Sequence, residues 1–73
     1  MSKSGFEWEP QSPDDWTCHW NEMYLHAKAD GRWWVMTDAG DICASSDQQA
    51  AGQDAQEAML RAQGVAIILQ RHK

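Results

Sequence analysis

The stretch "MYLHAKADGRWWVMTD", residues 23–38, decides the fold of this chain. Its centre, Asp30-Gly31, lies between two runs of residues that favour β-strands, and this dipeptide is the strongest short signal for a β-hairpin. A two-residue loop at this position makes the two flanking runs pair as antiparallel strands. The expected pairs are Ala29 with Arg32, Ala27 with Trp34 and Leu25 with Met36.

This register assigns each side chain to one face of the expected sheet, because successive residues of a strand point to opposite sides. The expected core face carries Met23, Leu25, Ala27, Trp34 and Met36. The opposite face carries Tyr24, His26, Trp33 and Val35, and it is only half polar. Trp33 is therefore expected either in cross-strand packing or at an interface with a partner.

A second hairpin is predicted in the sequence "TDAGDICAS", which continues the strand. Gly40 suits the left-handed position of a three-residue loop, and this loop places Thr37 opposite Asp41. The residues that this second hairpin adds to the core face are Ile42 and Ala44.

The next segment, "SSDQQAAGQDAQEAMLRAQG" over residues 45–64, predicts an α-helix. Ser46 is a suitable N-cap, Gln49 completes a capping box, and Gly64 marks the expected end of the helix. The apolar stripe expected to face the sheet consists of Ala51, Ala55, Ala58, Met59 and Ala62. The following "VAIIL", residues 65–69, predicts a buried strand.

These elements predict an α+β fold with the order β-β-β-α-β. It consists of a three-stranded antiparallel meander, one helix packed on its face and a C-terminal strand. Residues 16–73 are expected to form this single small domain. Residues 1–15 are acidic and contain Pro10 and Pro13, so we expect a flexible N-terminal arm.

Composition narrows the class of function. The 73 residues carry a net charge of −5 with a pI of about 4.8, which argues against nucleic-acid phosphates as the main partner and favours a basic protein surface. Two cysteines allow at most one disulfide, and no secretory signal or membrane-spanning run is visible. We therefore expect a reduced, cytoplasmic monomer that binds neither membranes nor specific nucleic-acid sequences.

No constellation of residues in the sequence indicates catalysis. The potential metal ligands are Cys18, His19, His26, Cys43 and His72, and they lack the spacing of known metal sites. A cysteine with His26 could act as a nucleophile and base, but no glycine-rich oxyanion loop accompanies them. We expect no enzymatic activity, no metal and no cofactor.

The stretch "FEWEPQSPDDW", residues 6–16, suggests a different role. Large aromatic residues ringed by acids in an extended arm match the way in which disordered segments bind a basic groove. Packing of the arm on the sheet is the alternative. The predicted partner-binding residues are Phe6, Glu7, Trp8, Glu9, Asp14, Asp15 and Trp16 of the arm region, together with Trp33 of the sheet.

The whole chain resembles the small transcription regulators of lytic phages that bind host bacterial RNA polymerase. The resemblance rests on length, on the acidic and tryptophan-rich character, and on "EWEPQSPDDWTCHW" ahead of "ADGRWWVMTDAGD". It implies binding to the N-terminal region of the β′ subunit of the polymerase in the host cytoplasm. It also implies inhibition of promoter-dependent initiation, by interference with σ-factor engagement, and antitermination. It assigns no role to an individual residue.

Two alternatives remain open at this stage. The chain could inhibit another host target, such as a nuclease, with its acidic surface mimicking nucleic acid. It could also bind single-stranded nucleic acid by stacking bases on the face that carries Tyr24, His26 and Trp33. A gel shift with an oligonucleotide at low and moderate salt separates the second alternative from the protein-binding functions.

Overall fold

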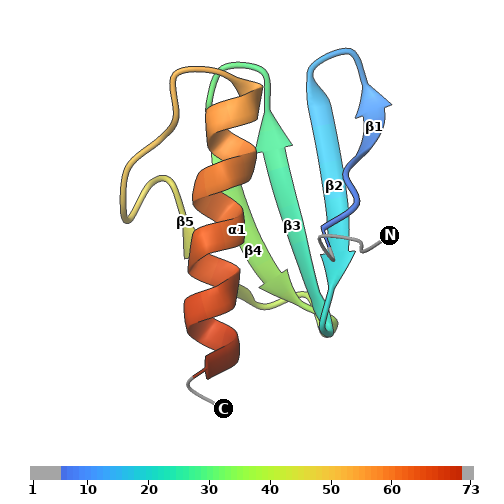
Figure 1. The fold of residues 1–73 in the computed structure, drawn as a ribbon, viewed down its shortest axis with the longest axis vertical. Coiled ribbons are helices and arrows are strands. Elements are labelled where there is room, and N and C mark those ends of the chain that lie inside the picture. The colour runs from blue at the N-terminus through green and yellow to red at the C-terminus, as the bar shows by residue number, and fades with distance from the viewer. Residues whose placement is uncertain (1–5, 72–73) are drawn as a thin grey trace, which may run out of the picture.

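A computed structural model of the chain, described over residues 6–71, shows five antiparallel strands followed by one helix (Figure 1). The elements are β1 (Glu9–Ser12), β2 (Asp15–Trp20), β3 (Met23–Lys28), β4 (Trp33–Thr37), β5 (Ile42–Ser45) and α1 (Ala55–Arg71). The strands pair in chain order, β1-β2-β3-β4-β5, and α1 packs on β3 and β4. The α+β class is confirmed, whereas the expected order β-β-β-α-β is wrong.

The chain before Asp30 forms two strands, β2 and β3, where the expected three-stranded meander has one. It turns back at Asn21 and Glu22, which have φ angles of +50° and +65°. Positive φ at both positions of a two-residue loop is the geometry of the hairpin turn that matches strand twist. Trp20 therefore lies opposite Met23. This turn has little local signal in the sequence, because no glycine occupies it.

The hairpin at Asp30-Gly31 exists, but its register differs from the expected one by one residue. Lys28 N–H donates to Arg32 O at 2.8 Å, so the loop has three residues and ends on Gly31 with φ +98°. Ala27 consequently pairs with Trp33 rather than with Trp34.

This shift exchanges the faces of β4. Trp33 and Val35 are buried in the core, whereas Trp34 and Met36 lie on the opposite face. Gly31 is fixed in this loop because its carbonyl accepts a hydrogen bond from Gly52 N–H at 2.8 Å. A Cβ on Gly31 would lie 1.9 Å from the Gly52 carbonyl oxygen.

The second hairpin has the expected three-residue loop. Thr37 N–H donates to Asp41 O at 2.9 Å, and Gly40 has φ +95°. Ala44 is buried as expected, but Ile42 is 62% exposed. Ile42 pairs with Met36 and lies with it on the side of the sheet away from the core. An irregularity in the pairing of β4 with β5 places Ala44 opposite the buried Val35, so the extra residue in β5 keeps Ala44 on the core side.

The helix begins later and ends later than the sequence predicts. Asp54 caps α1, since Glu57 N–H donates to Asp54 Oδ1 at 3.0 Å and the Glu57 carboxylate accepts the Gln53 N–H. Ser46 instead bonds to the backbone of Trp33.

Residues 65–69, expected as a strand, continue α1 through Gly64. Ala58, Ala62 and Ala66 repeat every four residues and form the buried ridge of the helix. Val65 and Leu69 lie beside this ridge, and both are partly buried against the core. The four-residue spacing of these alanines therefore indicates the helix more reliably than the apolar run "VAIIL" indicates a strand.

The predicted flexible arm over residues 1–15 differs from the structure in its second half. Glu9–Ser12 form β1, which pairs with β2, and Phe6 and Trp8 pack against the core. Prolines are tolerated here because β1 is an edge strand. Residues 1–5 lie outside the described part of the chain. Whether residues 16–73 fold alone stays a prediction.

Candidate functional site

One face of the five-stranded sheet is uncovered within residues 6–71. The helix packs on β3 and β4 from one side, and Figure 1 shows it lying across that side of the sheet. The opposite side, here called the outer face, carries aromatic and apolar side chains from four strands. Its members are Thr17, His19, Tyr24, His26, Trp34, Met36 and Ile42.

The first cross-strand row of the outer face runs from His19 through Tyr24 and Met36 to Ile42. The rings of His19 and Tyr24 stack with centroids 4.4 Å apart and an angle of 23° between their planes. Tyr24 is 39% exposed and Ile42 is 62% exposed. This row therefore presents aromatic and apolar side chains to solvent, with Met36 half-buried between Tyr24 and Ile42.

The second row pairs Thr17 with His26 and His26 with Trp34. The His26 and Trp34 rings stack nearly parallel, with centroids 4.8 Å apart and an angle of 12°. Burial of the ring is the main cause that lowers the pKa of His26. The negative charge of Asp15 raises this pKa, and the positive charge of Lys28 lowers it. Burial thus favours the neutral form of His26, and its ring extends the flat surface of Trp34.

Charged groups lie at the two ends of the outer face. At one end Asp15 of β2 lies opposite Lys28 of β3 in the strand register, and Asp30 Oδ2 accepts a hydrogen bond from Arg32 Nε at 2.9 Å. The Oδ1 atom of Asp15 is buried without a hydrogen-bond partner in the part of the chain described. At the other end, His19 Nε2 lies 3.1 Å from Asp38 Oδ1.

The aromatic residues predicted to anchor a partner lie on the opposite side of the sheet from the outer face. Phe6 stacks on Trp20 with centroids 4.5 Å apart, and Trp8 Nε1–H donates to Gln63 Oε1 at 2.7 Å. Trp16 pairs with Ala27, a buried core residue, and is itself half-buried. These three aromatics therefore have contacts within the chain.

The remaining predicted partner-binding residues are dispersed. Glu7, Glu9 and Asp14 are exposed, and Asp14 accepts a hydrogen bond from Ser12 at 2.9 Å. Asp15 lies on the outer face. Trp33 is 1% exposed, and its Nε1–H donates to Ala50 O at 2.8 Å. Trp33 is a core residue, so a partner cannot reach it.

Sequence reasoning assigned Tyr24 and His26 to the outer face correctly but missed Trp34. The single signal that could have identified Trp34 is the length of the loop at Gly31, because a three-residue loop reverses the faces of β4. Glycine at the last loop position is compatible with both loop lengths. Two adjacent tryptophans made both registers look equally apolar.

The described residues contain no group of three or more side chains able to hold a metal ion. Cys18 is buried, and its burial raises the pKa of the thiol. Cys43 is an exposed thiol at the opposite edge of the sheet from β1. Within residues 6–71 no helix is long and apolar enough to cross a membrane.

The arrangement of the outer face is suited to contact with another macromolecule.

Comparison with known proteins gives no match, since no family model, curated protein or solved structure is detectably similar to this chain.

Proposed function

We propose that the chain is a non-enzymatic regulator that binds host bacterial RNA polymerase through its outer face. The proposed target is the N-terminal region of the β′ subunit, in the cytoplasm of the host. Binding there inhibits promoter-dependent initiation by interfering with σ-factor engagement, and it promotes antitermination. The resemblance to phage transcription regulators supports the identity of the partner.

One observation carries the binding function: the outer face carries four aromatic rings together with Met36 and Ile42, and no element covers it within residues 6–71. Trp and Tyr are enriched among the residues that dominate binding energy, and the outer face contains Trp34 and Tyr24. Both belong to β-strands and stack on histidines. Rings held in this way lose little conformational freedom on binding, which favours affinity.

The charge of the molecule supports a basic partner surface. The net charge is −5, and the exposed carboxylates of Glu9, Asp14 and Asp38 lie around the sheet rather than at its centre. Charges at the rim of an interface accelerate encounter and contribute less to final affinity than buried aromatic anchors. The aromatic residues of the outer face thus provide the binding energy, and the carboxylates around it accelerate association with a basic surface.

The variant Trp34→Ala tests this proposal. We expect it to weaken binding to purified RNA polymerase about thirtyfold, because truncation of an aromatic anchor costs about 2 kcal/mol. Inhibition of promoter-dependent transcription should fall in parallel. Leu60→Ala is the matched control, since Leu60 is 60% exposed on α1 and lies outside the outer face. Unchanged affinity of Trp34→Ala would exclude the outer face as the binding surface.

A second candidate function is stacking of single-stranded nucleic acid, and the two stacked ring pairs of the outer face favour it. Such proteins combine aromatic platforms with a basic groove. On this side of the sheet Lys28 and Arg32 are the cations, and Arg32 is paired with Asp30. A gel shift with an oligonucleotide at low salt that persists at moderate salt would favour this candidate over protein binding.

A further inference from the structure

Helix α1 carries a second apolar surface, on a side that does not pack on the sheet. Three of its large apolar side chains are exposed: Leu60 by 60%, Ile67 by 38% and Ile68 by 54%. Gly64 between them is also exposed. The four residues lie on one side of the helix, because positions three, four, seven or eight apart share a helix face. They are here called the helix stripe.

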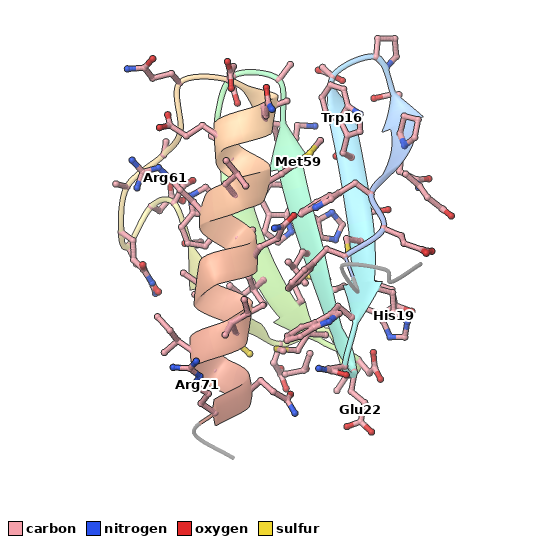
Figure 2. The ribbon with its side chains drawn as sticks, viewed as in Figure 1. Trp16, His19, Glu22, Met59, Arg61 and Arg71 are labelled. Carbon is pink, nitrogen blue, oxygen red and sulfur yellow. The ribbon has the colours of Figure 1, made fainter. Side chains whose placement is uncertain are left out.

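The helix stripe is accessible from outside the molecule. The ridge of buried alanines occupies the side of α1 toward the sheet, and Met59 is partly buried against the core. Figure 2 shows Arg61 and Arg71 projecting from the side of α1 opposite Met59. A groove of about 310 Å³ lies beside the stripe, between α1 and residues 49–50. A second helix can therefore lie along this side of α1.

Gly64 occupies the centre of the helix stripe, where the fold of the single chain does not require a glycine. A Cβ at this position would meet no atom within 4 Å. Glycine is also one of the least favourable residues inside a helix, yet α1 continues through Gly64. A glycine allows another backbone to approach closely. Gly64 is therefore suited to the point where a second helix crosses α1.

The helix stripe is self-complementary about Gly64. Leu60 precedes Gly64 by four residues, and Ile68 follows it by four. When two copies of α1 pack antiparallel and cross at Gly64, Leu60 of each copy meets Ile68 of the other. A two-fold symmetric interface requires this reciprocal relation between its contacts. The pattern therefore favours a second copy of this chain over an unrelated helix.

The charges of α1 fit the same arrangement. Glu57 lies in the first turn and Arg71 in the last turn, so antiparallel packing brings Arg71 of each copy beside Glu57 of the other. Glu57 Oε1 accepts the Gln53 N–H, and its Oε2 lies 3.9 Å from Arg61 Nη2, too far for a strong pair. Arg71 forms no ion pair within residues 6–71. Exposed ion pairs add little affinity, so these charges mainly orient the two helices.

We propose that the helix stripe binds a second copy of this chain in an antiparallel, two-fold symmetric dimer that crosses at Gly64. This dimer replaces the monomer expected from the sequence, and it goes beyond the function proposed above. Burial of apolar side chains drives the association. A contact between two 17-residue helices buries less than about 1,200 Å², the size of weak and transient interfaces. The expected dissociation constant is therefore on the order of micromolar or weaker.

Sedimentation velocity of the full chain at rising concentration measures the association. We expect the mass of one chain, 8.3 kDa, at low micromolar concentration and an approach to twice this mass at high micromolar concentration. A two-fold dimer is closed, so the mass should rise no further. A monomer at every concentration up to millimolar would overturn the proposal, as would assemblies larger than a dimer.

The variant Gly64→Gln tests the crossing point. We expect it to weaken the dimer at least tenfold, because a long side chain at the crossing separates the two helices. The thermal midpoint at low micromolar concentration should stay the same or rise, since glutamine favours the helix more than glycine does. Gln70→Ala is the control at an exposed position of α1 outside the stripe. Equal association of Gly64→Gln and the unsubstituted chain would contradict the proposal.

The variant Arg71→Glu tests the antiparallel orientation. It places like charges together at both ends of the interface and should weaken the dimer about three- to tenfold. Gln70→Glu adds negative charge at the neighbouring position outside the stripe and should change the dissociation constant by less than twofold. A dimer unaffected by Arg71→Glu would exclude the antiparallel arrangement, because parallel helices bring like charges together in both chains.

The variant Leu60→Ala separates this dimer from the proposed function. It should weaken the dimer about tenfold, since each dimer loses two leucine contacts, and it should leave the affinity for polymerase unchanged. Trp34→Ala should dimerise normally, because Trp34 lies on the side of the sheet away from α1. A Leu60→Ala chain that dimerises as well as the unsubstituted chain would contradict the dimer and would not affect the proposal on the outer face.

Discussion

The two faces of the sheet are built from the same five strands but carry different kinds of surface. The covered face has Leu25, Trp33 and Val35, each at most 1% exposed, under a helix that contributes only alanines at its closest ridge. The outer face has Trp34 and Tyr24, each stacked on a histidine, with Trp34 half-buried and Tyr24 39% exposed. Adjacent tryptophans thus have opposite roles, and position in the register rather than residue type decides which one holds the fold.

The covered face also shows how a short chain closes a wide sheet. Helix α1 packs on β3 and β4, and the segment before β1 packs Phe6 and Trp8 against the core. Ala58, Ala62 and Ala66 let α1 lie close to the sheet, so large side chains such as Trp33 fill the space between the layers. The outer face has no such cover within residues 6–71.

The difference between the covered face and the outer face is tested most directly by the two variants Trp33→Ala and Trp34→Ala. Trp33→Ala should cost about 3–5 kcal/mol, because it leaves a large cavity in the core. Trp34→Ala should cost only about 1 kcal/mol, the order expected for one stacked aromatic pair. Urea unfolding followed by circular dichroism measures both. Equal losses of stability would contradict the division of the sheet into a core face and an outer face.

A smaller effect is expected at Phe6, which belongs to the N-terminal cover of the sheet. Phe6→Ala should lower the free energy of unfolding by about 1–2 kcal/mol, because it removes a half-buried ring and its stack on Trp20. Thermal unfolding provides the measurement. The exposed Glu9, substituted by Gln, serves as the neighbouring control. A midpoint unaffected by Phe6→Ala would restore the interpretation of residues 1–15 as a free arm.

The smallest effect concerns the protonation of His26. Burial holds the pKa of folded His26 below its ordinary value of 6.5, so the unfolded chain takes up a proton at higher pH than the folded chain does. The stability associated with neutral His26 is therefore full above pH 6.5 and is lost as the pH falls toward the lower, folded pKa.

His26→Gln should remove this part of the pH dependence while leaving that of the carboxylates in place. Urea midpoints between pH 7.5 and 5.5 measure the effect in both proteins. The same decline in His26→Gln as in the unsubstituted chain would show that the outer face does not shield this histidine.

Local sequence signals located two of the hairpin turns, although the loop at Asp30-Gly31 is one residue longer than predicted. The three-residue loop at Gly40 and the hairpin at Asp30-Gly31 both exist, since each depends on residues within the turn itself. The turn at Asn21-Glu22 was missed because a non-glycine pair rarely adopts positive φ at both positions. The register after Gly31 was missed because it depends on Gly52, a residue distant in sequence whose backbone contacts the loop.

The bounds of the helix also depend on contacts that local sequence signals do not contain. Ser46 with Gln49 and Asp54 with Glu57 are both plausible capping pairs, and only the packing of the ridge from Ala58 to Ala66 selects the second. Val65 to Leu69 fit a strand by composition. As part of the helix, Val65, Ala66 and Leu69 pack against the core, while Ile67 and Ile68 are exposed.

The outer face could be predicted in part. Tyr24 and His26 follow from the alternation along β3, which does not depend on the register of the neighbouring strand. Trp34 does depend on that register, as does the burial of Trp33.

The position of α1 after all five strands has a consequence for synthesis of the chain. Each strand pairs with its neighbour in the sequence, so the meander can form from local contacts as it emerges from the ribosome, and such contacts form quickly. The helix that covers β3 and β4 emerges on the order of seconds later. Until then Leu25 and Trp33 are exposed on one side while Tyr24 and Trp34 are exposed on the other. That interval is when the nascent chain is most prone to aggregate, and slower translation of residues 55–71 should lower its soluble yield.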